Sequence, residues 1–262
     1  MGVMDITNFA HGEYLMLSLY ASFWLFEFFH IDPYLSVLLV IPLMFLLGLL
    51  TEKFLIRPTI GKPMFIHIFV TLGLSVILQN LALLLWSGNF RTIQVPFATH
   101  TINFGDISIS TPRLIIFMVT LTVAYLIHLF LNYTWMGKAI RATSQNRNSA
   151  QLMGININRV FMVTFALGTA CLGIAGPLLM PIYYVYPTIG FQFVLVAFVA
   201  VVMGGLGSVK GAVLASMLIG IIETLSGYFL DPAMKQAIYF LLFILVLIFK
   251  PSGIFGEEGK VV

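Results

Sequence analysis

The stretch MFIHIFVTLGLSVILQNLALLLW, residues 64–86, decides the fold class because it carries no formal charge over 23 residues. A helix of about 20 apolar residues is long enough to cross the hydrocarbon core of a bilayer. The stretch therefore predicts a transmembrane helix, and the rest of the chain has to be searched for others.

The composition also points to a membrane protein. The 262 residues are 60% hydrophobic and 9% charged, and the mean hydropathy is +1.03. Soluble domains carry about 25% charged residues, so this chain cannot cover a surface that faces water. No polar stretch is long enough for a soluble domain, and we expect one transmembrane domain over residues 1–262. The single cysteine, Cys171, excludes an intrachain disulfide and a cysteine metal cluster.

Seven more apolar runs predict further membrane helices. They lie at residues 13–29, 33–51, 114–131, 160–180, 192–206, 211–230 and 234–249. Together with residues 64–86 they predict an all-α, polytopic bundle with about eight membrane segments. The run 192–206 is short and continues into GGLGSVKG, which indicates a broken or tilted crossing.

The distribution of basic residues orients the chain, because cytoplasmic loops carry an excess of Lys and Arg. Ten of the thirteen basic residues lie in residues 52–63, 132–159 and 207–210 and in the tail from residue 250. We expect these segments, including the C-terminus, to face the cytoplasm of a multi-pass protein in the cell (inner) membrane. The loop 87–112, on the opposite side, alternates enough to predict a short hairpin.

The motif NFAHGE places Asn8, His11 and Glu13 at the beginning of the first apolar run. A zinc site of the H-E-x-x-H type needs two histidines on one helical face, whereas the next histidine here is His30. We therefore expect no metal. Two interpretations remain open: the three residues line the transport path, or they brace the mouth of the helix bundle.

Glu223 is the deepest carboxylate, at the thirteenth position of the run 211–230. An ionised side chain at the centre of a membrane helix costs about 2.5–3.5 kcal/mol. We expect Glu223 to be shielded from lipid. It either forms a structural ion pair or hydrogen bond, or it takes part directly in translocation.

The glycines of GGLGSVKG are Gly204, Gly205, Gly207 and Gly211. A nucleotide-binding P-loop requires Ser or Thr after its lysine, but Lys210 is followed by glycine, and both flanks are apolar runs. Close helix packing and a tight cytoplasmic turn account better for these glycines. With no G-x-S-x-G motif and no paired catalytic aspartates, we expect no catalytic residues, no cofactor and no enzymatic activity in this chain.

The basic loop 132–159 carries the strongest sign of a partner. Ala150 and Gly154 are four residues apart, so in a short helix they would share one face and leave a shallow notch there. Exposed polar residues nearby would surround the notch; they include Arg141, Gln145 and Asn146. The helix would seat a partner outside the bilayer, and the alternative is a solvated basic loop.

Four separated blocks resemble a known family. GVMDITNFAHGEYLML, GKAIRATSQNRNSAQLMGININRV, YPTIGFQFVLVAFVAVVMGGLGSVKGAVL and KPSGIFG are similar to the membrane permease subunits of bacterial ABC importers for branched-chain amino acids. The version AFVAVVMGGLGSVKGA is similar to the first of the two paired permeases in these importers. Importers for urea and short amides share the same blocks, so the resemblance leaves these substrates open.

The resemblance implies a translocation pore without enzymatic chemistry of its own. A second permease would complete the pathway, two cytoplasmic ABC ATPases would hydrolyse ATP, and an extracytoplasmic binding protein would deliver substrate. Membrane lipid is a further expected partner, and nucleic acid is not expected as one. The pair Ala150 and Gly154 resembles the core of the coupling-loop motif of ABC importers. The glutamate that begins this motif in the family is absent here, and Asn148 and Ser149 lie near its expected position.

Two further expectations follow from the same comparison of residues. Members of the family carry an apolar helix before the NFAHGE block, whereas Met1 precedes Asn8 by only seven residues. We therefore expect that the coding sequence extends upstream, or that this chain works poorly alone. The rival function is a secondary transporter driven by an ion gradient, in which His11, Glu13 and Glu223 would form a proton relay.

Overall fold

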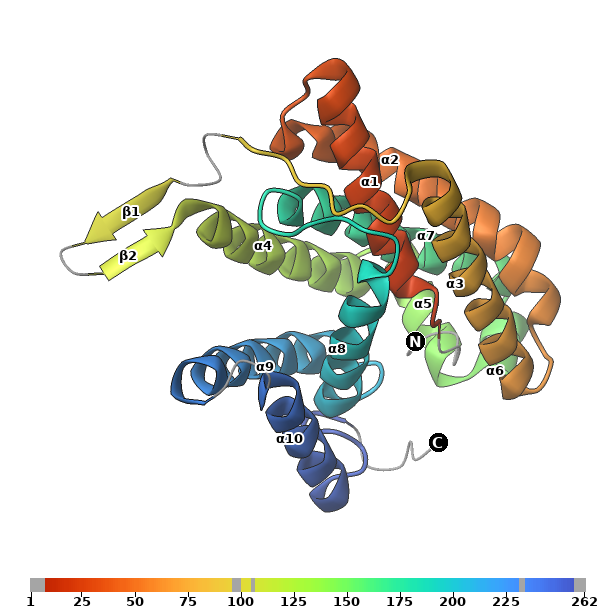
Figure 1. The fold of residues 1–262 in the computed structure, drawn as a ribbon. Helices are drawn as coiled ribbons and strands as arrows, with labels where there is room; N and C mark the ends of the chain where they lie inside the picture. Colours follow the sequence, from red (N-terminus) through yellow and green to blue (C-terminus); the bar gives the residue numbers. More distant parts are fainter. Residues whose placement is uncertain (1–7, 96–99, 105–106, 231–233, 257–262) are drawn as a thin grey trace. The chain divides into compact units, whose positions relative to one another are not determined.

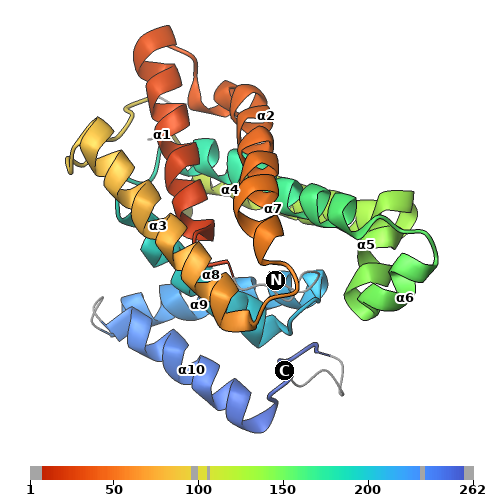
Figure 2. The same cartoon turned by 90° about the vertical axis from the view of Figure 1, so that its right-hand side faces the viewer.

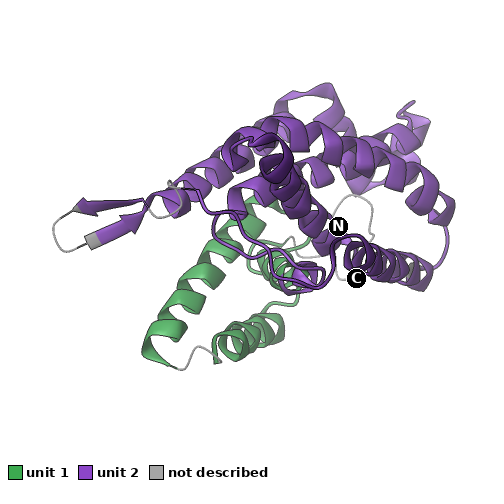
Figure 3. Ribbon diagram, turned by 45° about the horizontal axis from the view of Figure 1, so that its top comes forward, with its two compact units in different colours: residues 1–5, 193–262 green, residues 6–192 purple. Residues whose placement is uncertain are grey.

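A computed structural model describes residues 8–95, 100–104, 107–230 and 234–256. These residues form two compact units, one extending to Gln192 and the other beginning at Phe193 (Figure 3). Each unit is described by itself below.

The chain is mostly α-helical, which confirms the predicted fold class. Within the described residues, the longer helices are α1 (His11–Phe29), α2 (Pro33–Thr51), α3 (Met64–Trp86), α4 (Thr111–Tyr133), α5 (Trp135–Gln145), α7 (Ile157–Leu179), α8 (Ile189–Gly204), α9 (Val209–Phe229) and α10 (Lys235–Phe249) (Figure 1). Three short segments join them: the π-helical turn η1 (Glu52–Ile56), the 3-10 turn η2 (Arg57–Thr59) and the helix α6 (Arg147–Leu152).

Each of the eight expected membrane segments coincides with one helix. Five helical spans are long and apolar enough to cross a bilayer, namely Pro33–Thr59, Phe65–Trp86, Thr111–Tyr133, Ile157–Leu179 and Val209–Phe229. The helices α8 and α10 are apolar but have only 16 and 15 residues. The chain is thus an integral membrane protein, while the number of eight crossings stays a prediction.

The expected hairpin is present in the loop between α3 and α4. Strands β1 (Thr101–Phe104) and β2 (Ile107–Ser110) pair antiparallel, with Thr101 opposite Ser110. The hairpin projects from the N-terminal end of α4 (Figure 1). Antiparallel strands need only a tight turn between them, so a short alternating segment is sufficient to form this pair.

The core of the first unit lies where α1, α2, α3 and α7 meet. Tyr14, Val40 and Met44 are buried there, and Leu74 and Phe165 pack against them. The four helices come from distant parts of the sequence and lie side by side (Figure 1, Figure 2). This arrangement brings the polar residues of α1 close to those of α3.

Small residues allow α7 to approach its neighbours closely. A side-chain carbon added to Gly173 would lie 2.9 Å from the Ile41 Cα atom of α2, and one added to Gly176 would collide with Ser18 of α1. The Ser18 hydroxyl also donates a hydrogen bond of 2.8 Å to the Leu172 carbonyl. Such contacts between small and hydroxyl residues are typical of helices that associate within membranes.

We expect Gly173→Ala to destabilise the first unit, because the added methyl group meets the α2 backbone. Overpacking of this kind costs about 1–3 kcal/mol. The matched control is Gly73→Ala in α3, where an added carbon meets nothing within 4 Å and alanine is the better helix former by about 1 kcal/mol. Thermal melting of both purified variants, followed by circular dichroism, checks the prediction. Equal midpoints would contradict the close packing of α7 on α2.

The second unit has its own core. Val199 and Met203 of α8 are buried against Ala215 and Ile219 of α9 and Tyr239 of α10. In its described residues, the unit is therefore a small assembly of three helices, and the segment after α10 packs against the end of α8.

Two of the sequence blocks quoted above meet in the second unit. The Ile254 amide, in KPSGIFG, donates a 2.8 Å hydrogen bond to the Met203 carbonyl, just before GGLGSVKG. Gly205 has a φ of 101°, and a side-chain carbon there would lie 2.6 Å from the Gly256 nitrogen. Only glycine fits this position without strain, because the backbone is left-handed and the tail lies directly against it.

Candidate functional site

Asn8 and its neighbours form the entrance of α1. The Asn8 side-chain oxygen accepts a 3.0 Å hydrogen bond from the Ala10 amide, and its carbonyl accepts one of 3.3 Å from the His11 amide. The first amides of a helix have no partner within the helix, and Asn8 supplies one for this turn. Asn8 itself is buried.

Glu13 is buried and holds α1 to α3. Its exposed fraction is 1%, and its Oε1 atom accepts hydrogen bonds from Ser75 Oγ at 3.1 Å and from Gln79 Nε2 at 2.7 Å. The other oxygen, Oε2, is buried without a hydrogen-bond partner. A side-chain carbon added to Gly190, in the first turn of α8, would lie 2.7 Å from Oε2. The glutamate therefore lies at the contact of three helices.

His11 faces a different neighbour. A side-chain carbon added to Gly168 of α7 would lie 3.6 Å from the His11 ring, and the ring makes an edge contact with Tyr14 at 6.4 Å. Asn8, His11 and Glu13 thus make separate contacts, with the α1 entrance, with α7 and with α3. Within the described residues, the structure does not bring the three side chains together into one binding site.

The partners of Glu13 are not among the residues predicted from the sequence. Ser75 and Gln79 are four residues apart, so they lie on one face of α3. A polar pair at this spacing inside an uncharged run is a usable signal, because buried polar groups in membrane helices need partners. The identity of the partner could not be predicted, since 62 residues separate Glu13 from Ser75.

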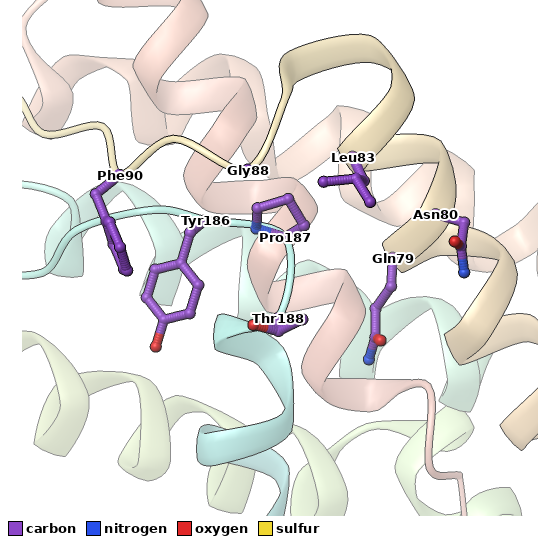
Figure 4. A pocket seen from close by; sticks show the side chains of 8 residues that line it. All are labelled: Gln79, Asn80, Leu83, Gly88, Phe90, Tyr186, Pro187 and Thr188. Carbon is purple, nitrogen blue, oxygen red and sulfur yellow. The ribbon is translucent and has the colours of Figure 1, made fainter.

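A pocket of about 320 Å³ lies beside this polar contact (Figure 4). Its lining comes from the outer part of α3, the segment after α3 and the segment before α8: Gln79, Asn80, Leu83, Gly88, Phe90, Tyr186, Pro187 and Thr188. Gln79 belongs both to the pocket and to the Glu13 contact. The pocket was not predicted, because its three segments are distant in sequence.

Arg91 fixes the segments that form the pocket wall. The backbones of Arg91 and Val185 exchange two hydrogen bonds, of 3.0 and 2.8 Å. The Arg91 guanidinium donates to the Trp86 carbonyl at 2.8 Å and lies 5.0 Å from the Trp24 ring. A cation over an aromatic face is attracted by the ring electrons. The segment after α3 is therefore held against both α1 and the residues that precede α8.

The basic loop 132–159 folds into two capped helices. The Thr134 hydroxyl accepts from the Gly137 amide at 3.0 Å and begins α5. Asn146 accepts from the Ser149 amide at 2.9 Å and begins α6. Side-chain acceptors at these positions satisfy amides that the helix leaves unpaired. Both helices lie next to the N-terminal end of α7 (Figure 2), with Arg141, Gln145 and Asn146 exposed.

The expected notch on α6 is wrong. The helix ends at Leu152, and Gly154 lies beyond it with a φ of 82°. The Gly154 amide donates to the Gln151 carbonyl at 3.0 Å and the Ile155 amide to the Ala150 carbonyl at 3.1 Å. These bonds form a Schellman cap, which requires a left-handed residue, usually glycine. Because Ala150 is buried, the two residues do not form an exposed face.

An apolar tip takes the place of the notch. Leu152 and Met153, at the end of α6, are 88% and 83% exposed, although this loop lies outside the five spans that are long enough to cross a membrane. Two large apolar side chains directly before a capping glycine, in a polar loop, are the sequence pattern that could have indicated this exposed apolar surface. We call Leu152 and Met153 the α6 tip.

Glu223 lies in the second unit, on α9, and is half-buried within that unit. Nearby, the Ser226 hydroxyl donates to the Ile222 carbonyl of the same helix. Glu223 lies in one unit, whereas His11 and Glu13 lie in the other, so the proton relay stays a prediction. Shielding of Glu223 from lipid stays a prediction.

The four glycines at the connection of α8 to α9 have two different roles. A side-chain carbon on Gly204 would lie 2.6 Å from the Ala212 nitrogen, and one on Gly211 would lie 2.9 Å from the Gly204 carbonyl carbon. Gly205 and Gly207, in the turn between the helices, have φ values of 101° and 90°. One pair thus lies where two backbones approach, and the other pair forms the turn.

Comparison with known proteins covers nearly the whole chain. The family model described as "Branched-chain amino acid transport system / permease component" matches residues 1–247. The chain is 33% identical to the "High-affinity branched-chain amino acid transport system permease protein LivH" of Escherichia coli (strain K12), over 98% of this chain and 87% of that protein.

Two further relatives extend this result. The chain is 32% identical to the corresponding permease protein BraD of Pseudomonas aeruginosa, over 98% of this chain and 88% of that protein. It is 27% identical to the "Probable branched-chain amino acid transport permease protein LivM" of Methanocaldococcus jannaschii, over 61% of this chain and 55% of that protein. No solved structure matches the chain. The chain therefore belongs to the family of branched-chain amino acid transport system permease components.

Proposed function

We propose that the chain is the pore-forming subunit of an ATP-driven importer of branched-chain amino acids. The names of the LivH and BraD relatives support this substrate. The α6 tip supports ATP hydrolysis by a partner subunit as the energy source, because its exposed apolar side chains offer an ATPase a docking site outside the spans that are long enough to cross a membrane. Large exposed apolar residues at one place on a surface mark protein interaction sites.

The partners follow from this function. Two cytoplasmic ABC ATPases drive the importer, and one of them binds α6 of this chain, with Leu152 and Met153 as anchors and Arg141, Gln145 and Asn146 around them. A second permease, of the type represented by the LivM relative, completes the pore. A binding protein delivers substrate on the opposite side. Ala150 and Gly154 shape α6 for docking, through burial and the Schellman cap.

The orientation rests on the basic residues. The segment 52–63 and the helices α5 and α6 are rich in Lys and Arg, which favours the cytoplasmic side. The C-terminus then also faces the cytoplasm, whereas the pocket at the end of α3 lies toward the outside.

The polar residues of α1 and the glycines around the α8–α9 turn have bracing roles in this proposal. Asn8 and His11 fix the entrance of α1, and Glu13 joins α1 to α3 through Ser75 and Gln79. Gly204, Gly205, Gly207 and Gly211 pack the end of α8 against α9 and the tail. Glu223 is assigned to the wall of the pathway.

Uptake in cells tests the substrate. A strain without other branched-chain amino acid uptake is given this chain with its partner subunits, and accumulation of labelled leucine, urea and acetamide is compared. We expect leucine accumulation that unlabelled isoleucine and valine inhibit, and none of urea or acetamide. Accumulation of urea or acetamide without leucine would show that the substrate is wrong while the family stands.

A further inference from the structure

The pocket beside Glu13 presents hydrogen-bond acceptors at one end. The Gln79 amide nitrogen donates to Glu13 Oε1 at 2.7 Å, and the Asn80 amide nitrogen donates to the Val76 carbonyl at 2.8 Å. Both partners are acceptors, so the nitrogen of each amide has to face its partner. The carbonyl oxygens of Gln79 and Asn80 are then left for the pocket, which both residues line (Figure 4).

Glu13 reinforces this polarity from behind. Its carboxyl group lies one hydrogen bond from Gln79, is 1% exposed, and has an Oε2 atom without a hydrogen-bond partner. The Glu13 carboxyl oxygen polarises the amide that donates to it, and hydrogen bonds are stronger in a buried site than in water. The acceptor end of the pocket therefore favours a cationic donor group.

The other end of the pocket is apolar and aromatic. Phe90, Tyr186 and Pro187 line it, and the Phe90 and Tyr186 rings are in contact with centroids 4.7 Å apart. Leu83 adds apolar surface from α3, beside Gln79 and Asn80 (Figure 4). The volume of about 320 Å³ lies at the lower end of the range for ligand pockets, about 300–1,000 Å³. A ligand that fits both ends is small and joins an ammonium group to a short apolar chain.

We propose that this pocket is a binding site for a small apolar amino acid, with its ammonium group on the carbonyl oxygens of Gln79 and Asn80 and its side chain against Leu83, Phe90 and Tyr186. The site deepens the proposed function and rests on it, since it assigns the place where the substrate is held before it enters the path. The site recognises the ammonium group, which is common to all amino acids, and the limited size of its apolar end restricts the side chain of the ligand.

Photolabelling tests the site directly. The membrane complex of this chain with its second permease and ATPases, in lipid nanodiscs, is irradiated with a leucine analogue that carries a diazirine in its side chain. We expect mass spectrometry to find the label on Leu83, Phe90 or Tyr186. Leucine and 3-methylbutylamine, which both have the ammonium group, should prevent labelling, whereas 4-methylpentanoate, which lacks it, should not.

A variant keeps the test independent of folding. Asn80→Leu removes one acceptor, and the Asn80 side chain is exposed and donates its hydrogen bond to Val76 of the same helix, so the fold should persist. We expect labelling to fall about tenfold or more, as for the loss of a hydrogen bond to a charged group. The matched control is Leu84→Ala on the same helix, which is 82% exposed and does not line the pocket; it should label like the unchanged chain.

The outcomes separate the site from the function. Unchanged labelling in Asn80→Leu, or protection by 4-methylpentanoate, would overturn the placement of the ammonium group. No label in the pocket, while the same complex in proteoliposomes with its binding protein imports leucine, would overturn the site and leave the proposed function standing. Failure to import leucine at all would overturn the proposed function.

Discussion

Glu13→Ala is expected to remove most of the folded protein and with it the uptake of leucine. The variant leaves Ser75 and Gln79 without their shared acceptor inside a helix contact. A buried donor that is left without its acceptor costs about 1–3 kcal/mol, so leaving two lowers the free energy of unfolding by roughly 2–6 kcal/mol. A chain of this size should melt roughly 4–24 °C lower.

A thiol-reactive dye measures the effect, because Cys171 is the single cysteine and unfolding exposes it fully. The control is Glu13→Gln, in which an amide oxygen can still accept from Ser75 and Gln79. We expect Glu13→Gln to melt within a few degrees of the unchanged chain. If Glu13→Ala melts at the same temperature as Glu13→Gln, the carboxyl group does not hold α1 to α3.

Replacing the α6 tip by Leu152→Ala with Met153→Ala is expected to abolish uptake without affecting folding. Both side chains are more than 80% exposed, so their truncation leaves no cavity. Anchors at the centre of an interface contribute 2 kcal/mol or more, and the loss of one such anchor weakens binding roughly thirtyfold. Co-purification of the ATPase with the variant, together with labelled leucine uptake, measures the loss.

The matched control for the α6 tip is Asn146→Ser, because Asn146 surrounds the anchors without being one, and a serine hydroxyl can accept from the Ser149 amide as the Asn146 side chain does. It should retain both the ATPase and uptake. Should the double variant at Leu152 and Met153 also retain both, α5 and α6 are a solvated connector and the docking assignment is wrong.

The sequence predicts the helices well because the bilayer imposes the same requirement on every span. The uncharged run 64–86 becomes α3 with the same bounds, and the other seven runs each coincide with a helix. Helix ends are less predictable, since they depend on caps such as Asn146 and on the left-handed residue Gly154. The spacing of Ala150 and Gly154 predicts a shared helical face, but glycine is also the usual C-terminal cap of a helix, and the structure shows the cap.

The functional residues divide in a similar way. Glu13 could be identified from sequence, because a carboxyl group at the edge of an apolar run has to be satisfied by protein or water. Its partners, Ser75 and Gln79, are set by the packing of α1 on α3, which no local pattern encodes. The pocket depends further on the pairing of Arg91 with Val185, and pairing across that distance in sequence follows only from the assembled fold.

We infer that leucine crosses the membrane through a path that this chain helps to form, and that ATP hydrolysis drives this transport. The most direct measurement is leucine accumulation in proteoliposomes that contain this chain, its second permease and the ATPases, with the binding protein on the opposite side of the membrane. We expect accumulation only when ATP is present on the ATPase side, with no change when proton and sodium gradients are dissipated. Accumulation without ATP that disappears with either gradient would contradict the account.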